Sequence, residues 1–224
     1  ADKSLFFEAL DADYMEVTRM RSFVNYQPGE TRSCIGCHES HASAPPIGSA
    51  PGALATPAVA ILPQPGDVGP RPLHYPTDVQ PILDLHCIRC HGGDAPEGEL
   101  DLTGELTTYF SRSYEQLMNR GLVTCIQEFQ GPQPRAQKQN VTPLPPYALG
   151  SHASRLITVL RQGHHEVALS RPEFVRLTTW IDANAPYYGS YFGRRNLIYR
   201  EHPDFRPIPT LLSASGIPPK TYGP

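Results

Sequence analysis

Two copies of one five-residue pattern, Cys-x-x-Cys-His, constrain this chain more than any other feature. CIGCH occupies residues 34–38 and CIRCH occupies residues 87–91. On a helical turn, residues i, i+3 and i+4 lie on one face, which presents two thiols and an imidazole together. The pattern is the attachment signature of c-type haem, whose vinyl groups bond the thiols while the histidine binds the iron. We therefore predict two covalently bound haem c groups. The residues that hold them are Cys34, Cys37, His38, Cys87, Cys90 and His91.

Other interpretations of the cysteines are less consistent with the pattern. One Cys-x-x-Cys pair is also typical of a redox-active dithiol, and two pairs can hold zinc through four thiolates. Neither site requires histidine directly after the second cysteine, whereas histidine follows both pairs here. The fifth cysteine, Cys125, belongs to neither motif, and we expect it to be a small buried apolar residue.

Proline and glycine are unusually frequent and limit the amount of regular structure. The 224 residues include 25 prolines and 18 glycines, so much of the chain must be loop. Such a chain needs support beyond its own core, and an attached macrocycle supplies apolar bulk around which it can pack. The expected fold class is mainly α, with cytochrome c-like helices around two covalently bound haems, much irregular chain and a small N-terminal β-hairpin.

Charge and hydropathy exclude two kinds of partner. The formal net charge is −3 and no lysine or arginine run occurs, which argues against nucleic acid. No apolar stretch approaches the roughly 18 residues of a membrane span, so we expect a chain that is not membrane-spanning. The chain opens without the segments of an export signal, which we expect to have been removed or to belong to a longer precursor. Because bacteria attach haem c outside the cytoplasm, we expect a periplasmic or other extracytoplasmic location.

Local patterns predict a hairpin and two helices in the first half of the chain. Apolar residues on both sides of the acidic turn at 11–13 predict two short strands within residues 4–23. Thr77 is a candidate N-cap for a helix that runs into the second motif. Ser113 is expected to open another short helix, which ends near Gly121.

Two further helices are predicted in the second half. Ser151 is a candidate N-cap for a helix that ends near Gly163. Ser170 and Glu173 have the spacing of a capping box, which predicts the start of the last helix.

These patterns divide the chain into four units. Residues 1–41 are expected to form the β-hairpin and the first haem-attachment unit, and residues 42–74 an Ala/Pro-rich linker. Residues 75–186 are expected to form a second, cytochrome c-like haem domain. Residues 187–224 are rich in aromatic residues and proline, and we expect them to wrap the surface.

Several stretches resemble a known family. In order, they are RSFVNYQPGETRSCIGCHES, VQPILDLHCIRCHGG, LDLTGE, SYEQLMNRGLV, GSHASRLITVLRQGHHEVALS and TTWIDANAPYYGSY. They resemble the C-terminal cytochrome portion of hydrazine synthase alpha-subunit-like proteins and related planctomycete-type multihaem fusions. The resemblance covers nearly the whole chain apart from the Ala/Pro linker. In that family this portion usually follows a β-propeller, so the resemblance implies a redox partner protein or a fused catalytic or β-propeller domain.

The resemblance also informs the first haem. It corresponds to the active-site haem of hydrazine synthase, where a tyrosine four residues after the motif's histidine binds the iron and that histidine turns to zinc. Here this position is Ala42. The difference argues against hydrazine-forming chemistry and leaves His38 as an ordinary proximal ligand.

For the second haem, the resemblance implies electron transfer with two histidine ligands, the distal one in the segment GHHEV. We favour His164 as this ligand, because it follows Gly163 at the end of a predicted helix where the backbone is free to turn the side chain inward. His165 is the alternative, and His152 is a weaker one.

The sixth ligand of the first haem stays open among several residues. His41 is too close to His38 in sequence to reach the opposite face of the same ring. The candidates are Met20, Met15 and His74. If none of them binds, the iron is open to a small molecule.

Two functions are therefore possible, depending on whether the first iron has a sixth ligand from the protein. The first, which we favour, is electron transfer between a periplasmic donor and a redox enzyme or fused catalytic domain. The second is a hydrazine synthase-like haem enzyme, acting on a small nitrogen or oxygen species at an open first haem. The aromatic cluster at residues 187–192 is expected to pack at a haem edge, and Arg194 and Arg195 either pair with haem propionates or lie in solvent.

Overall fold

The computed structural model describes only part of the chain. The described residues are 4–20, 23–27, 29–30, 48, 57, 60, 62–69, 71–126 and 144–188. The first motif, with Cys34, Cys37 and His38, lies outside them, as do His41 and Ala42. Most of the predicted linker and the predicted C-terminal wrap beyond residue 188, with Arg194 and Arg195, lie outside them as well.

The N-terminal segment is a hairpin of two short antiparallel pairs. Strands β2 (Glu8–Leu10) and β3 (Glu16–Arg19) pair next to the turn, and β1 (Ser4–Leu5) and β4 (Val24–Asn25) pair further out. Asp11 holds the turn, because its Oδ1 accepts hydrogen bonds from the backbone N–H groups of Asp13 and Met15, both at 2.9 Å. The two strands predicted around the acidic turn are thus present.

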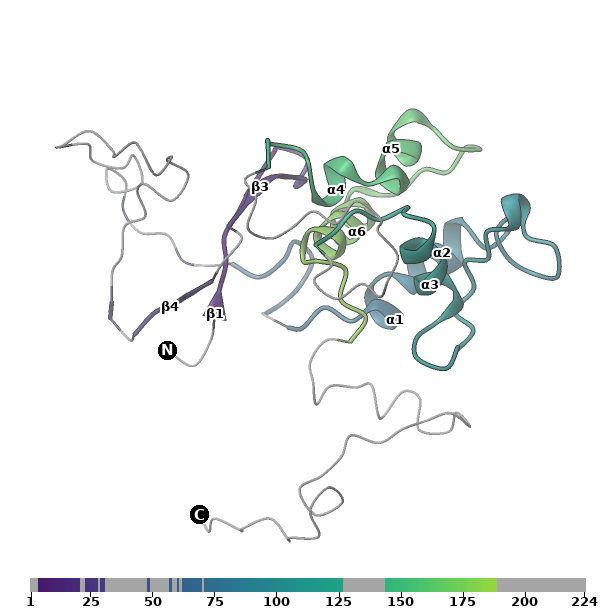
Figure 1. The fold of residues 1–224 in the computed structure, drawn as a ribbon, viewed down its shortest axis with the longest axis horizontal. Helices are drawn as coiled ribbons and strands as arrows, with labels where there is room; N and C mark the ends of the chain where they lie inside the picture. The colour runs from purple at the N-terminus through teal and green to yellow at the C-terminus, as the bar shows by residue number, and fades with distance from the viewer. Residues whose placement is uncertain are drawn as a thin grey trace, which may run out of the picture.

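The remaining described elements are short helices that pack around α6. They are α1 (Tyr75–Asp78), α2 (Gln80–His86), the 3-10 turn η2 (Glu97–Glu99), α3 (Arg112–Asn119), α4 (Gly150–Ala153), α5 (Arg155–Gln162) and α6 (Arg171–Asp182). Figure 1 shows α6 at the centre, with contacts to α1 on one side and α4 on the other. Of the helices described, none has the length and apolar character needed to cross a membrane.

Helix α6 forms the centre of the core for reasons visible in its sequence. The predicted capping box is present, since the Ser170 side chain accepts from the Glu173 N–H and the Glu173 carboxylate accepts from the Ser170 N–H. The helix buries Trp180 completely against Tyr75, with 5.1 Å between the ring centroids, and the indole N–H donates to the Pro186 carbonyl at 3.0 Å.

Two other predicted N-caps are wrong by one turn or less. The N-cap of α1 is His74, and Thr77 lies inside the helix, because Pro76 fits only the first turn. The N-cap of α3 is Ser111. Ser113 is instead fully buried, and its hydroxyl accepts a hydrogen bond from the Tyr75 hydroxyl at 2.9 Å.

The helix predicted to begin at Ser151 is two helices. Ser151 lies within α4, and the chain breaks at Ser154 before α5 begins. The Ser151 hydroxyl is not free to cap a helix because it donates to the buried Asp182 carboxylate at 2.8 Å. A polar contact across the fold therefore replaces the local cap that the sequence suggested.

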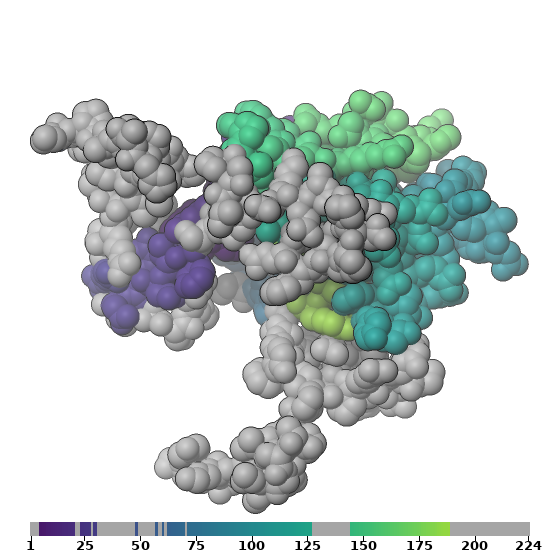
Figure 2. Space-filling model, viewed as in Figure 1, coloured from purple at the N-terminus to yellow at the C-terminus, as the bar shows by residue number. Residues whose placement is uncertain are grey.

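Those same residues join the hairpin to the helices. The Glu16 N–H donates to Asp182 Oδ2 at 3.1 Å and to Ser151 Oγ at 3.3 Å, and the Tyr147 N–H donates to the Val17 carbonyl at 2.8 Å. At the hairpin turn, Asp11 Oδ2 lies 2.8 Å from His152 Nε2. The space-filling view in Figure 2 shows the hairpin, in purple, on one flank of the helical mass.

The described end of the predicted linker is also held on the helices. Asp67 accepts from Arg176 of α6 at 2.8 and 3.0 Å, and Arg71 donates to Asp78 of α1 at 2.9 Å. Arginine and carboxylate pair well in this two-point geometry. Asp67 and Arg71 therefore anchor this end of the predicted linker to α6 and α1.

The joint between hairpin and helices contains more carboxylates than cations. Arg19 is paired with Glu16 and lies 3.9 Å from Glu8. Burial raises the pKa of Glu8 from 4.5 to about 7 and that of Asp182 from 3.8 to about 6. Both groups therefore bind protons more tightly in the folded chain, so their contribution to stability falls as pH rises from about 4 to about 7.

Glu8→Gln is expected to remove part of this pH dependence. The variant should be close to the wild type in stability near pH 5 and more stable than it at pH 8, by about 2–3 kcal/mol, because glutamine has no charge to bury. Urea unfolding at both pH values measures the difference. Parallel stability curves for the two proteins would show that Glu8 ionises normally in the folded state.

Candidate haem site

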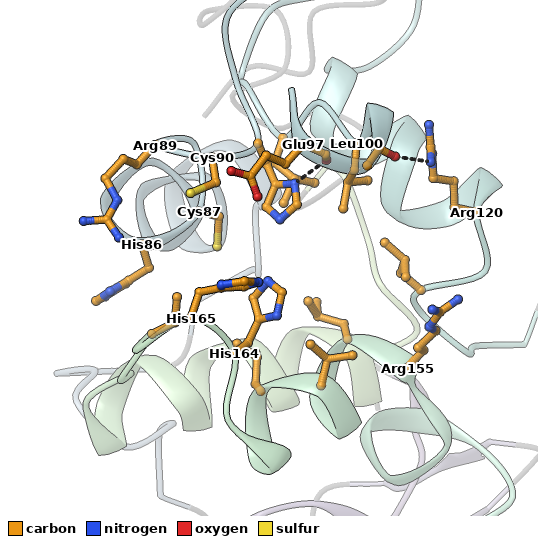
Figure 3. Close-up of a pocket in the computed structure, with 18 of the residues that line it drawn as sticks. His86, Cys87, Arg89, Cys90, Glu97, Leu100, Arg120, Arg155, His164 and His165 are labelled. Carbon is orange, nitrogen blue, oxygen red and sulfur yellow. Dashed lines mark hydrogen bonds between the residues drawn. The ribbon is translucent and has the colours of Figure 1, made fainter. Parts of the chain in front are cut away.

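A cavity of about 750 Å³ lies between the second motif and helix α5. Figure 3 shows Cys87 and Cys90 on one wall, and His164 and His165 on the facing wall. The first wall is the turn that follows α2, and the second is the segment after α5. The cavity therefore brings together residues more than seventy positions apart in the chain, all of them named from the sequence as haem-site candidates.

The second motif forms one turn of helical type directly after α2. The His91 N–H donates to the Cys87 carbonyl at 2.9 Å, which is the spacing of an α-helical bond, and the Cys90 N–H donates to the same carbonyl at 3.1 Å. The helix predicted to run into the motif thus ends at His86, and the motif continues as a single turn. This turn points both thiols and the imidazole toward the cavity.

A backbone contact orients the His91 ring. Its Nδ1 lies 3.0 Å from the carbonyl oxygen of Glu97, which accepts the Nδ1 proton. Nε2 is then left as the unprotonated nitrogen that can bind a metal. Histidine ligands of metals usually have this second contact, which fixes the tautomer and makes the ligand more basic.

His164 faces His91 across the cavity. The two ring centroids are 6.0 Å apart and the ring planes differ by only 10°. Two metal–nitrogen bonds of about 2 Å each, plus the ring radii, require a separation of roughly 6 Å between the centroids. The spacing therefore fits one metal atom between the two imidazoles.

The turn that carries His164 has an unusual backbone. Gly163, His165 and Glu166 all have positive φ angles, of 87°, 45° and 64°. Residues other than glycine rarely adopt this region, and where they do so in clusters the strain often accompanies a functional site. Its main described backbone contact is the bond from the Val167 N–H to the His164 carbonyl, at 2.8 Å.

The Cys87 thiol lacks the lowered pKa that is typical of a redox-active dithiol. Cys87 and Cys90 are free thiols in this structure. Burial raises the pKa of the Cys87 thiol to about 11, so it is neutral at pH 7. Redox-active dithiols require a lowered thiol pKa.

The rest of the cavity wall is mostly apolar, as a macrocycle requires. Its apolar residues are Leu100, Leu102, Leu122, Leu156, Val159, Leu160 and Val167. The residues just after η2 place Leu100 and Leu102 in this wall, and Leu102 is only 3 % exposed. The Leu102 N–H donates to the His91 carbonyl at 2.7 Å, which holds this stretch against the motif.

The other candidate ligands lie elsewhere. His165 lines the cavity beside His164, with ring centroids 4.6 Å apart, whereas His152 contacts Asp11 and is not part of the cavity wall. His74 is buried at the start of α1, and its Nδ1 lies 3.1 Å from Thr77 Oγ1.

The two methionine candidates belong to the hairpin. Met15 is buried in the core, and its sulfur accepts from Arg161 at 3.6 Å. Met20 is half-buried, and its N–H donates to the Phe7 carbonyl at 2.8 Å. The first motif lies outside the described residues, so the roles of His74, Met15 and Met20 stay predictions.

Two expectations on packing can be compared with the structure. Tyr187 is 3 % exposed and stacks on Tyr75 with 5.5 Å between ring centroids, so it packs in the aromatic core rather than on the cavity wall. The Tyr187 ring makes edge contacts with other aromatic rings there, so its packing needs no cofactor. Cys125 packs against the same core but is half-buried, whereas a buried residue was expected.

Sequence reasoning missed the polar residues that surround the cavity. The Glu97 carbonyl and the side chains of Arg89, Arg120 and Arg155 all belong to the wall. A backbone carbonyl leaves no signature in sequence, and single arginines are common on any surface. The apolar spacing in the LDLTGE stretch was the one available signal for Leu100 and Leu102.

The residues that the structure describes include no candidate site for a metal ion held by protein side chains alone. No group of three or more histidine, cysteine, aspartate or glutamate side chains is close enough to share an ion there. A haem iron needs only two axial ligands from the protein. The facing pair His91 and His164 supplies that number.

The comparisons with known proteins give one match. The family model of the hydrazine synthase alpha subunit middle domain matches residues 1–39. Comparison with curated proteins and with solved structures gives no match. The matched segment contains the hairpin and the first motif. The similarity is therefore shown for residues 1–39, and it is to the middle domain of the alpha subunit rather than to the C-terminal cytochrome portion that the resemblance named.

Proposed function

We propose that this chain is a dihaem c-type cytochrome that transfers electrons between a periplasmic donor and a redox enzyme or a fused catalytic domain. The observation that supports this most directly is the pairing of His91 and His164 across a cavity that also presents Cys87 and Cys90. Each of these residues has a role at a haem that its position in the cavity suits.

The residues of the chain divide the work at this site. Cys87 and Cys90 would tether the macrocycle by thioether bonds, and His91 and His164 would fill both axial positions of the iron. When bound, haem supplies an iron that accepts and releases one electron. If His91 and His164 both hold the iron, the protein would leave no place on it for a substrate, and this favours electron transfer over catalysis at this site.

The wall of the cavity serves electron transfer in two ways. The leucines would exclude water from a bound macrocycle, and the Glu97 carbonyl orients the His91 ring. Both features limit reorganisation around the iron when its charge changes. Histidine at both positions, rather than histidine and methionine, is expected to give a low midpoint potential.

His164→Ala is expected to convert the second haem from low spin to high spin. The loss of one axial imidazole leaves the iron five-coordinate or bound to water, and absorbance and electron paramagnetic resonance spectra of the oxidised protein report the change. His152→Ala is the matched control, because His152 lies on α4 away from the cavity, and it should leave the spectrum unchanged. An effect of His165→Ala in place of His164→Ala would assign the ligand to the neighbour.

The mass of the intact chain tests the proposal before any substitution. Two attached haems raise it by twice the mass of one haem. A mass equal to that of the amino acids alone, or the presence of zinc in place of iron, would overturn the proposed function.

A second candidate function is supported by the match at residues 1–39. This segment includes the first motif and is similar to a domain of hydrazine synthase, so the first haem is the place for an open iron that acts on a small nitrogen or oxygen species. Carbon monoxide added to the reduced protein distinguishes the two functions. Two six-coordinate haems that do not bind carbon monoxide would support electron transfer. A haem that binds it would support catalysis.

A further inference from the structure

The cavity has two chemically different ends. Figure 3 shows Cys87 and Cys90 at one end, Arg120 and Arg155 at the other, and His164 between them. A third arginine, which also lines the cavity, lies at the cysteine end and is Arg89. The side chains thus distinguish one edge of any flat group bound in the cavity from the opposite edge.

A haem has the same asymmetry. The vinyl groups that bond to the cysteines lie on one side of the macrocycle, and the two propionate carboxylates project from the opposite edge. A macrocycle tethered at Cys87 and Cys90, with its iron between His91 and His164, therefore directs its carboxylates toward the end that contains Arg120 and Arg155. Arginine is well suited to this contact, since its planar guanidinium donates two parallel hydrogen bonds to a carboxylate.

The two arginines at this end are not equivalent. Arg120 already donates to the Gln116 side chain at 2.6 Å and to the carbonyls of Gly98, at 3.1 Å, and Glu99. Its guanidinium is therefore committed to holding η2 against α3. Arg155, the first residue of α5, is exposed, and its guanidinium forms no hydrogen bond or ion pair with any residue that the structure describes.

We propose that Arg155 binds a propionate carboxylate of the haem at the second motif. The inference rests on the proposed attachment of that haem, and it adds a residue to the site that neither the motif nor the resemblance identified. Arg155 begins α5 and His164 lies two residues after this helix ends at Gln162, so α5 would hold the haem at two points, through its first residue and through the ligand just beyond its end.

Arg155→Gln in the full chain tests this assignment. Two readouts are expected to change: the propionate bending vibration in the resonance Raman spectrum, and the midpoint potential of the haem whose low-spin signal depends on His164. Removal of a cation near the iron favours the ferric state, so the equilibrium constant for reduction should fall by about five- to tenfold, or about 40–60 mV. Arg155→Lys restores the charge and should recover most of the potential.

Arg89→Gln is the matched control. It removes the same charge from the same cavity but at the thioether end, so it should leave the propionate vibration unchanged. A wild-type vibration and potential in Arg155→Gln, with the haem attached and its two-histidine signal intact, would overturn the assignment. An equal effect of Arg89→Gln on the vibration would also overturn it.

A measurement on the unmodified protein does not depend on how the variants fold. Arginine modification by phenylglyoxal, followed by peptide mapping, should be slower at Arg155 than at Arg89, because a propionate covers the first guanidinium and not the second. Equal reaction rates would contradict the inference. Failure of the proposed function itself is distinguishable, since it appears as a chain without attached haem in the mass spectrum.

Discussion

A chain with Cys87 and Cys90 both replaced by serine is expected to lose one haem and at least about 3 kcal/mol of folding free energy. Serine cannot form the thioether bonds, so the macrocycle has no covalent attachment at this site. The leucines of a cavity of about 750 Å³ then face water rather than a flat apolar group. Each such side chain contributes roughly 1.5–3 kcal/mol when it is fully buried, so the loss of cover for even two of them accounts for the expected change.

Mass spectrometry and guanidinium unfolding measure the two effects separately. The intact mass should fall by one haem, and the unfolding midpoint of the helical unit should fall with it. Cys125→Ser is the matched control because it exchanges the same atoms at a half-buried cysteine outside both motifs. It should keep both haems. An unchanged haem content in the double variant would contradict attachment at the second motif.

Gly150→Ala is expected to destabilise the chain by about 2–5 kcal/mol and to separate the hairpin from the helices. Gly150 has a φ of +64°, which costs alanine about 1–2 kcal/mol. Its missing side chain also makes room for two carboxylates, because a Cβ at this position would overlap Glu16 Oε2 and Asp182 Oδ1. Those carboxylates belong to the buried joint and have little freedom to move.

Gly93→Ala separates backbone strain from the clash. Gly93 also has a positive φ, of 74°, but a Cβ there would meet no atom within 4 Å. It should therefore cost only the strain, about 1–2 kcal/mol. Thermal unfolding gives both values, and limited proteolysis within residues 4–25 reports whether the hairpin has separated. Equal destabilisation by the two substitutions would mean that the Glu16 and Asp182 carboxylates can move aside for the new methyl group.

The parts of the site that sequence reasoning could predict are those fixed by spacing along the chain. The second motif predicted that Cys87, Cys90 and His91 share one turn, and the structure places all three on one turn that lines the cavity. His164 was predicted from the glycine before it and from the resemblance, and the structure places it opposite His91. The capping box at Ser170 and the acidic hairpin turn were predicted correctly for the same reason, since each is a contact within a few residues.

The features that sequence reasoning missed depend on contacts across the fold. Ser113 and Ser151 were expected to cap helices, but each bonds to a partner more than thirty residues away, Tyr75 and Asp182 respectively. Local propensity predicts what a serine does best alone, and a buried tertiary partner outweighs it. The role of the cavity arginines likewise depends on which end of the cavity they line, and this position is known only from the fold.

The hydrogen bonds from Glu16 to Ser151 and Asp182 have a consequence for how such a protein could be divided or recombined. The N-terminal strands pack on helices that follow them by more than a hundred positions in the chain. The hairpin and the helices are therefore expected to unfold together, although they are far apart in sequence. A gene fusion that contained the helical unit alone would remove the Glu16 N–H, which donates to Ser151 and to the buried Asp182 carboxylate. The hairpin and the helices are therefore expected to be inherited together, as a single cooperative body.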